Sequence, residues 1–131
     1  MAGKLKIPRN LKHKPIVYWD IQNEKEEIST DAKFISLGYA SWNHDDFSVK
    51  IFRKPNKRWS RQSEEIPPQR LLNLSLFLIS KIFEEELCFE NEGVLENTDA
   101  LNNYLAQFRD STSIKQIFKI LAKHIKEIKD L

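Results

Sequence analysis

The chain has 131 residues, of which 40% are hydrophobic and 31% are charged, and its formal net charge is +2. These proportions exclude a disordered chain, and the length predicts a single domain with an ordinary apolar core. The one cysteine excludes an intrachain disulfide, and the three histidines lack the spacing of a zinc site. We therefore expect no metal and no cofactor.

The apolar stretches are too short to predict a membrane protein. The longest uncharged one, residues 71–80, is far from the roughly 20 residues that a membrane span needs. Residues 1–6 lack the apolar centre of a signal peptide. Together with the single cysteine, these features predict a cytoplasmic protein that does not contact a membrane.

The chain opens with a basic arm, residues 1–14, whose five cations stand without an acid: Lys4, Lys6, Arg9, Lys12 and Lys14. Further on, residues 50–61 hold six cations and no acid, whereas residues 84–96 hold six glutamates and no base. Such asymmetry is typical either of a face for an acidic or nucleic-acid partner or of ordinary solvated surface.

Alternating side chains and turn residues predict four strands in an antiparallel meander, at residues 16–21, 34–42, 47–53 and 58–63. The second strand has an alternative, because Thr30 and Asp31 are suited to cap a short helix from Ala32. Residues 43–46 are expected to form a hairpin loop, and residues 54–57 a turn in which Pro55 sets the backbone angle.

Three helices are expected to follow the strands. The first begins at Pro67 and Pro68, is apolar on all sides from Leu71 to Phe83, and ends near Glu86, so it is predicted to be buried, with Leu74 and Leu78 nearly inaccessible. Apolar residues at helical spacing predict an amphipathic helix over residues 97–109 and another from Ile114 to the C-terminus.

The expected fold is therefore α+β: residues 1–131 form one domain in which an antiparallel sheet of about four strands packs on a buried central helix. Two amphipathic helices follow it, and the basic arm precedes it.

The polar segment around Trp59 is the strongest candidate for a binding site. Its arginines suit carboxylate or phosphate, and Trp59 suits stacking on a base or on a guanidinium. The alternative is an ion-pair network that locks the turn into the first helix, with Arg61 paired to Glu64, Glu65 or Asp31. The binding hypothesis comprises Arg53, Lys57, Arg58, Trp59, Arg61, Gln62, Glu64 and Glu65.

Three groups of residues, 30–33, 38–40 and 57–67, carry a family resemblance. The last reads Lys57-Arg58-Trp59-Ser60-Arg61-Gln62-Ser63-Glu64-Glu65-Ile66-Pro67. Together they resemble the shared core of a family of small bacterial proteins of unknown function, over roughly residues 5–85. The resemblance implies a bacterial or phage origin, and it implies no activity, cofactor or mechanism.

Two further hypotheses rest on charged residues. A nucleic-acid-binding module would use the basic arm, the cluster from Arg53 to Arg61 and a lysine stripe on the last helix, with Lys12, Lys14, Lys115, Lys119 and Lys123 as contacts. A small metal-dependent nuclease would use Asp31, Lys33, Glu64 and Glu65.

The leading expectation is a non-enzymatic cytosolic binding or accessory protein whose partner is another protein, with bacterial defence or counter-defence as one setting. No catalytic residue is assigned. The sequence contains no glycine-rich phosphate loop, since its only glycines are Gly3, Gly38 and Gly93.

Overall fold

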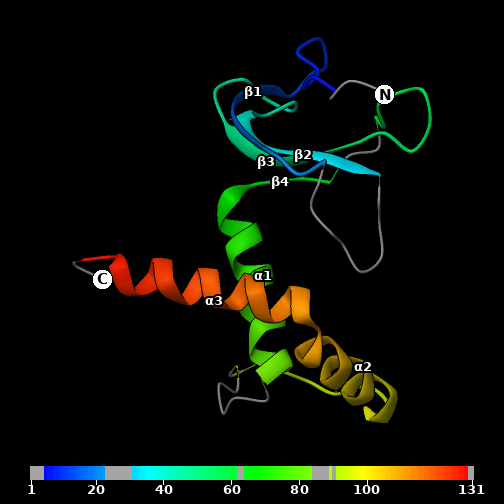
Figure 1. The fold of residues 1–131 in the computed structure, drawn as a ribbon, viewed down its shortest axis with the longest axis vertical. Helices are drawn as coiled ribbons and strands as arrows, with labels where there is room; N and C mark the ends of the chain where they lie inside the picture. The colour runs from blue at the N-terminus through cyan, green and yellow to red at the C-terminus, as the bar shows by residue number, and fades with distance from the viewer. Residues whose placement is uncertain (1–4, 23–30, 62–63, 84–88, 90, 130–131) are drawn as a thin grey trace. The chain divides into compact units, whose positions relative to one another are not determined.

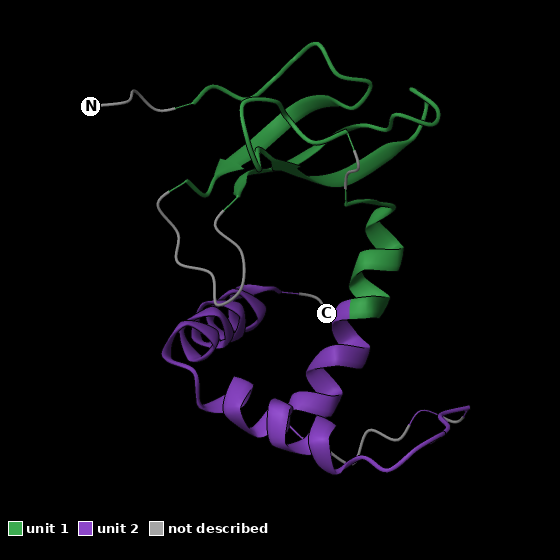
Figure 2. Cartoon of the chain, turned by 90° about the vertical axis from the view of Figure 1, so that its right-hand side faces the viewer, with its two compact units in different colours: residues 1–74 green, residues 75–131 purple. Residues whose placement is uncertain are grey.

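A computed structural model describes residues 5–22, 31–61, 64–83, 89 and 91–129 of the chain (Figure 1). Its elements in chain order are β1 (Lys14–Asp20), β2 (Ala32–Tyr39), β3 (Phe47–Arg53), β4 (Glu65–Ile66), α1 (Pro68–Phe83), α2 (Asp99–Asp110) and α3 (Thr112–Glu127). The chain divides into two compact units, residues 1–74 and residues 75–131 (Figure 2). The assignment of the whole chain to one domain stays a prediction.

The strands form one antiparallel sheet in the order β1-β2-β3-β4, so each strand pairs with its neighbour in sequence. The predicted α+β class and the antiparallel meander are thereby confirmed, and β3 has the predicted bounds. The loop between β2 and β3 is also as expected. Asp46 donates its backbone N–H to the carbonyl oxygen of Asn43, and the indole of Trp42 donates to the Asp46 carboxylate at 3.1 Å.

Gly38 lies in β2 opposite a register shift between Pro15 and Val17 in β1. A Cβ atom at position 38 would overlap the backbone carbonyl oxygen of Lys14. Because only glycine allows this close approach, a residue that normally weakens a strand is required here. The segment from Ala32 to Tyr39 is thus a strand, and the alternative of a short helix is wrong.

The two faces of the sheet differ in burial. The inner face carries Phe34, Ser36, Ser48, Lys50 and Phe52, all buried at alternate positions of β2 and β3. The outer face carries large side chains that remain exposed: Val17, Trp19, Leu37, Tyr39 and Phe47. Residues directly opposite each other in an antiparallel pair share a face, and the pairs Val17–Leu37 and Tyr39–Phe47 are such partners.

Trp59 closes the aromatic part of the inner face. Its ring lies 6.0 Å from the ring of Phe34 and 6.1 Å from that of Phe52, centre to centre. Both phenylalanines are only 1% exposed. The segment after β3 therefore folds back over the sheet, and its tryptophan packs in the core of the first unit.

The predicted fourth strand over residues 58–63 is wrong. The described part of that segment, residues 58–61, has no strand conformation, and the strand that pairs with β3 is the two-residue β4, Glu65–Ile66. The backbone N–H of Ser60 donates instead to the carbonyl oxygen of Arg53, the last residue of β3. This bond brings the chain back immediately after β3, so the segment serves as a loop that positions Trp59.

The predicted packing of α1 as a buried central helix is not confirmed, and the prediction that Leu74 and Leu78 are nearly inaccessible is wrong. Leu74 is 54% exposed and Leu78 is 48% exposed, whereas the two buried residues of α1 are Ser80 and Ile82. Apolar residues on all sides of a helix make its burial favourable, but other elements of the protein must supply the side chains that cover the helix. The helix does begin at Pro68, as expected, while its predicted end near Glu86 lies outside the described residues.

The second unit contains the two predicted amphipathic helices, α2 and α3, joined by Ser111. Ser111 adopts an extended backbone, and its side chain accepts a hydrogen bond from the backbone N–H of Ile114, which starts the new helix. Leu105 and Ile114 are the buried residues of these helices. The last helix ends at Glu127, a few residues before the C-terminus.

Candidate functional site

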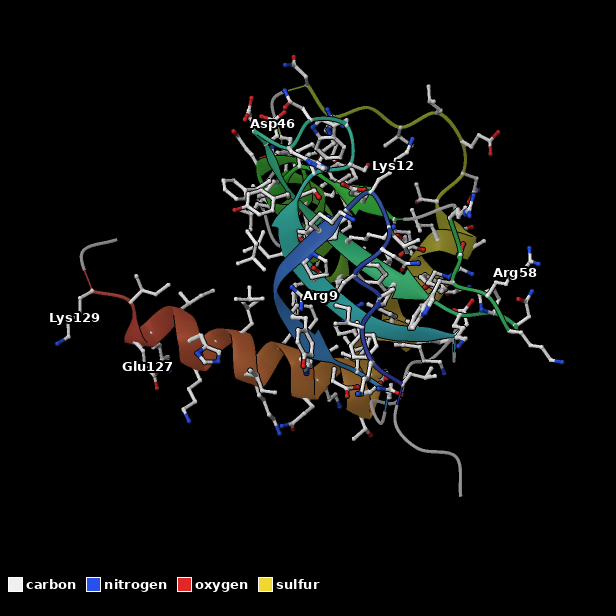
Figure 3. All side chains as sticks on the ribbon, turned by 90° about the horizontal axis from the view of Figure 1, so that it is seen from above. Arg9, Lys12, Asp46, Arg58, Glu127 and Lys129 are labelled. Carbon is white, nitrogen blue, oxygen red and sulfur yellow. The ribbon has the colours of Figure 1, made fainter. Side chains whose placement is uncertain are left out.

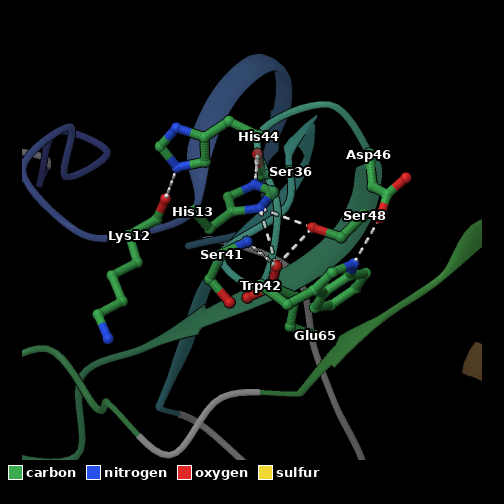
Figure 4. Close-up of polar contacts among 9 residues, drawn as sticks. All are labelled: Lys12, His13, Ser36, Ser41, Trp42, His44, Asp46, Ser48 and Glu65. Atoms are coloured by element: carbon green, nitrogen blue, oxygen red, sulfur yellow. Dashed lines mark hydrogen bonds and ion pairs between the residues drawn. The ribbon is translucent and has the colours of Figure 1, made fainter.

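A cluster of polar side chains lies on the inner face of the sheet, in the first unit (Figure 4). His13 comes from the basic arm, Ser36 from β2, Ser48 and Lys50 from β3, and Glu65 from β4. His13, Ser36 and Ser48 are at most 1% exposed, and Lys50 is 4% exposed. Strand alternation places the serines and the lysine on the same face as Phe34 and Phe52.

His13 joins the two buried serines. Its Nδ1 lies 2.8 Å from the hydroxyl oxygen of Ser48, and its Nε2 lies 2.8 Å from that of Ser36. Burial lowers the pKa of His13, an effect that Glu65 opposes and Lys50 reinforces. The imidazole is therefore neutral near pH 7, with one nitrogen donating and the other accepting.

Glu65 fixes which nitrogen carries the proton. Its Oε2 accepts the hydroxyl of Ser48 at 2.7 Å and the backbone N–H of Ser41 at 2.8 Å. Because the only proton of the Ser48 hydroxyl goes to Glu65, Ser48 must accept from His13, whose Nδ1 is then the donor. Nε2 in turn accepts from Ser36, and the bonds run in one direction from Ser36 to Glu65.

Glu65 is an ionised acceptor at the end of this chain. Burial alone would raise the pKa of its carboxyl, but the hydrogen bonds from Ser41 and Ser48 and the nearby His13 outweigh burial and lower it. Nδ1 of His13 is also 3.6 Å from Oε2 of Glu65. His13 is thus neutral because of its burial, against the effect of the nearby carboxylate, which favours the protonated imidazole.

Lys50 is the buried cation of the cluster. Its Nζ lies 5.2 Å from the centre of the Phe52 ring. Burial lowers the pKa of Lys50, and the charge of Glu65 opposes that effect. Among the described residues, no side chain or backbone group accepts a hydrogen bond from this ammonium.

A cavity of about 430 Å³ adjoins the cluster. It is referred to below as the Lys50 cavity, and it is lined by Asn10, Leu11, Lys12, His13, Ser41, Lys50, Arg61 and Glu65. The basic arm supplies one wall, and the β2–β3 loop, β3 and the segment before α1 supply the others. All of these residues belong to the first unit.

Two of the eight residues predicted to form a binding site, Arg61 and Glu65, line the Lys50 cavity. Arg53 does not, since its guanidinium binds the Asp31 carboxylate through two nitrogens, with Nη2 at 2.7 Å from Oδ2. The hydrogen bonds and charge of Asp31 raise the pKa of Arg53. This pair ties the end of β3 to the residue before β2.

The remaining predicted residues are spread over the loop after β3. Lys57 and Arg58 are exposed, and Figure 3 shows Arg58 extending away from the ribbon. Trp59 is half-buried and packs on the core phenylalanines, and its stacking on a base stays a prediction. Glu64 is exposed, and Gln62 lies outside the described residues.

The expected ion pair of Arg61 with Glu64, Glu65 or Asp31 is wrong. The oxygens of Asp31 are taken by Arg53, and Oε2 of Glu65 is taken by Ser41 and Ser48. Within the described part of the chain, Arg61 is an exposed guanidinium at the rim of the Lys50 cavity.

Sequence reasoning missed His13, Ser36, Ser48 and Lys50. Each looks unremarkable alone, and the three segments that carry them are well separated in the chain. A usable signal was present in β3, where Ser48, Lys50 and Phe52 alternate with Val49 and Ile51. Alternate residues of a strand point to opposite faces of the sheet, so Ser48 and Lys50 must lie on the same face as Phe52. If that face is buried, both polar side chains are buried with it.

The residues of the nucleic-acid hypothesis fall in both units. Lys12 lines the Lys50 cavity, and Nζ of Lys14 donates to the carbonyl oxygen of Arg9 at 3.1 Å. Lys115, Lys119 and Lys123 are exposed on α3 at intervals of four residues, which places them along one side of that helix.

Nowhere in the described ranges do three or more histidine, cysteine, aspartate or glutamate side chains gather so as to hold a metal ion. None of the described helices combines the length and apolar character needed to cross a bilayer.

Comparison with known proteins identifies the family of this chain. The model of a family of unknown function, DUF6530, matches residues 5–86, and the chain belongs to this family. The match agrees with the resemblance noted over residues 5–85, and it contains the sheet, the polar cluster and α1 but neither α2 nor α3. No curated protein and no solved structure matches the chain.

Proposed function

We propose that the protein is a non-enzymatic binding protein whose partner is another protein, contacted through the outer face of the sheet. The observation that carries this proposal is the exposure of large apolar side chains on that face. Val17, Trp19, Leu37, Tyr39 and Phe47 are between 43% and 57% exposed. Apolar patches of this kind on a folded chain are typical of contact surfaces.

The geometry of the outer face suits a protein partner. The rings of Tyr39 and Phe47 stack with their centres 5.6 Å apart, which makes a rigid aromatic platform. Beside it, a shallow depression of about 280 Å³ includes Val17, Trp19, Leu37 and Val49 in its lining. Aromatic anchors beside an apolar depression are the usual centre of a protein–protein interface.

Burial of the polar cluster favours a binding role over catalysis. A nucleophilic serine must reach its substrate, but Ser36 and Ser48 are 1% and 0% exposed. The carboxylates invoked for a metal-dependent nuclease, Asp31 and Glu65, are held by donors of the protein itself. Their oxygens serve structural hydrogen bonds, which supports a scaffold rather than a reaction centre.

We place this binding protein in the bacterial cytoplasm, as an accessory to another protein and with defence or counter-defence as one setting. The single cysteine supports a reducing compartment. The family match supports placing the contact surface in the first unit, because the matched residues contain the whole sheet.

The test is co-purification from the native host with quantitative identification of the bound material. The wild-type chain should retain one protein through a wash of moderate salt. A Trp19→Lys, Leu37→Lys double variant should lose it, because two charges would interrupt the apolar face. Leu95→Lys is the matched control, since Leu95 is a 99% exposed apolar residue in the other unit. Equal retention by both variants would contradict the proposal.

The alternative partner is a nucleic acid, and the exposed lysines of α3 favour it. Phosphate contacts release counterions, so such a complex would weaken steeply with salt. If nucleic acid co-purifies, is lost in moderate salt and is reduced by Lys119→Glu with Lys123→Glu, this alternative replaces a protein partner.

A further inference from the structure

We infer that the Lys50 cavity binds a small ligand through an anionic group, a carboxylate or a phosphate. The cavity lies on the inner side of the sheet, so this inference is independent of the protein partner proposed for the outer face. It rests on the state of Lys50, on the charges around the cavity and on its size.

Lys50 is a buried residue whose ammonium faces the cavity, since no fully enclosed side-chain nitrogen or oxygen among the described residues lacks a hydrogen-bond partner. The residue is 4% exposed, it lines the cavity, and no described residue accepts from its Nζ. An ammonium has three N–H donors, and the ring of Phe52 satisfies its charge only in part. Because the ammonium faces the cavity without a protein acceptor, an anion in the cavity would pair with it directly through charge-assisted hydrogen bonds.

Glu65 is the nearest protein carboxylate, but it does not fill this role. Its Oε2 already accepts from Ser41 and Ser48, and it forms no ion pair with Lys50. The backbone N–H of Ser41 and the hydroxyl of Ser48 hold Glu65 in place beside the cavity, where its charge opposes the lowering of the Lys50 pKa by burial.

The rest of the lining is positive. Three cations, Lys12, Lys50 and Arg61, face one carboxylate, Glu65, while His13 is neutral. The guanidinium of Arg61 is exposed at the rim, where it is suited to bind a carboxylate or phosphate through two parallel hydrogen bonds. An anion entering the cavity would therefore meet Arg61 first and Lys50 deeper inside.

The volume of about 430 Å³ limits the size of the ligand. It lies within the roughly 300–1,000 Å³ that is usual for small-molecule sites. Asn10 and Ser41 add polar groups to the lining, and Leu11 adds an apolar one. This combination suits a small organic anion better than a bare ion.

The test is a titration of the full-length protein with inorganic phosphate and, separately, with acetate, followed by backbone amide chemical shifts. Chloride at the same ionic strength is the control, because it reports screening alone. Saturable shifts centred on Ser41 and Lys50 are expected for at least one of the two anions. The more tightly bound anion identifies the ligand group, and the absence of saturation above chloride for both overturns the inference.

Substitutions show whether the ammonium is responsible. Lys50→Met keeps the length of the side chain without its charge, and it should weaken anion binding about tenfold or more. Lys6→Met is the matched control, since Lys6 is an exposed lysine of the same unit outside the cavity, and it should bind as the wild type does.

Arg61→Gln provides a second variant that does not depend on replacing a buried residue. Arg61 is exposed, so the variant should fold normally and bind the anion severalfold more weakly. The inference is overturned if the Arg61→Gln variant binds the anion with wild-type affinity and the Lys50→Met variant either does the same or fails to fold.

Discussion

The two faces of the sheet are made from the same strands, yet they differ in which side chains are buried. On the inner face, polar groups are buried and hydrogen-bonded, as in the series from Ser36 through His13 and Ser48 to Glu65. On the outer face, large apolar groups remain in water, with Trp19 57% exposed and Phe47 51% exposed. Stability therefore resides on the inner face, and the outer face keeps surface available for contact.

Truncating one phenylalanine on each face of β3 should give the largest contrast. Phe52→Ala should destabilise the protein by about 3–5 kcal/mol, because it leaves a cavity between His13, Phe34 and Trp59. Phe47→Ala removes the same atoms from a half-exposed position and should cost less than about 1 kcal/mol. Denaturant titration measures both, and equal costs would mean that the faces do not differ in packing.

The two histidines of the same region should differ by a smaller amount. His13→Ala leaves the buried hydroxyls of Ser36 and Ser48 without their shared partner, which should cost about 2–3 kcal/mol. His44→Ala removes an exposed hydrogen bond to the Lys12 carbonyl oxygen and should change stability by less than about 0.5 kcal/mol. A cost for His13→Ala no larger than that of His44→Ala would show that the buried bonds contribute little.

The pH dependence of stability should reflect the inner face. Burial lowers the pKa of His13 in the folded state, so below its ordinary value of 6.5 the unfolded chain binds a proton that the folded chain does not. Stability should thus be fully present above pH 6.5 and decline as the pH falls toward the folded pKa of His13. Protonation of Glu65 extends the decline below its ordinary value of 4.5, because its folded pKa is also lowered.

Thermal unfolding at a series of pH values measures this decline. A His13→Gln variant keeps a polar side chain but does not titrate, so its stability should be flatter just below pH 6.5 than that of the wild type. A wild-type curve that is equally flat in this range would show that His13 has the same pKa in both states.

The smallest effect is expected for the ion pair at the end of β3. The side chains of Arg53 and Asp31 are 34% and 18% exposed, so water screens their attraction in part. Arg53→Ala should cost about 0.5–1 kcal/mol, and less at high salt. A cost that exceeds that of His13→Ala would place the dominant polar interaction at this corner instead of in the buried cluster.

The regular elements could be predicted because their signals are local. Alternation predicted β3, β-branched and aromatic residues predicted β1 and β2, and prolines and apolar spacing predicted the three helices. The two-residue β4 was missed because a strand so short has no alternation of its own. Its pairing depends on Val49 and Lys50, which belong to another strand.

The candidate site could be predicted only in part, because its members come from separate segments. Arg61 and Glu65 were found through the density of charge around Trp59. His13 belongs to the cluster because the basic arm packs on the inner face of the sheet. This is a tertiary contact, and the alternation of residues within a strand does not predict it. The exposure of Leu74 and Leu78 was missed for a related reason, since the apolar pattern of a helix does not say what covers it.

The agreement between strand order and chain order has a consequence for the rate of folding. Each pairing in the sheet joins neighbours along the sequence, so the sheet can grow hairpin by hairpin across connections of 11, 7 and 11 residues. The bond between His13 and Ser48 is different, because it spans 35 residues. We expect docking of the basic arm to be the late step, so that an early intermediate would hold a formed meander with its inner face still open to water.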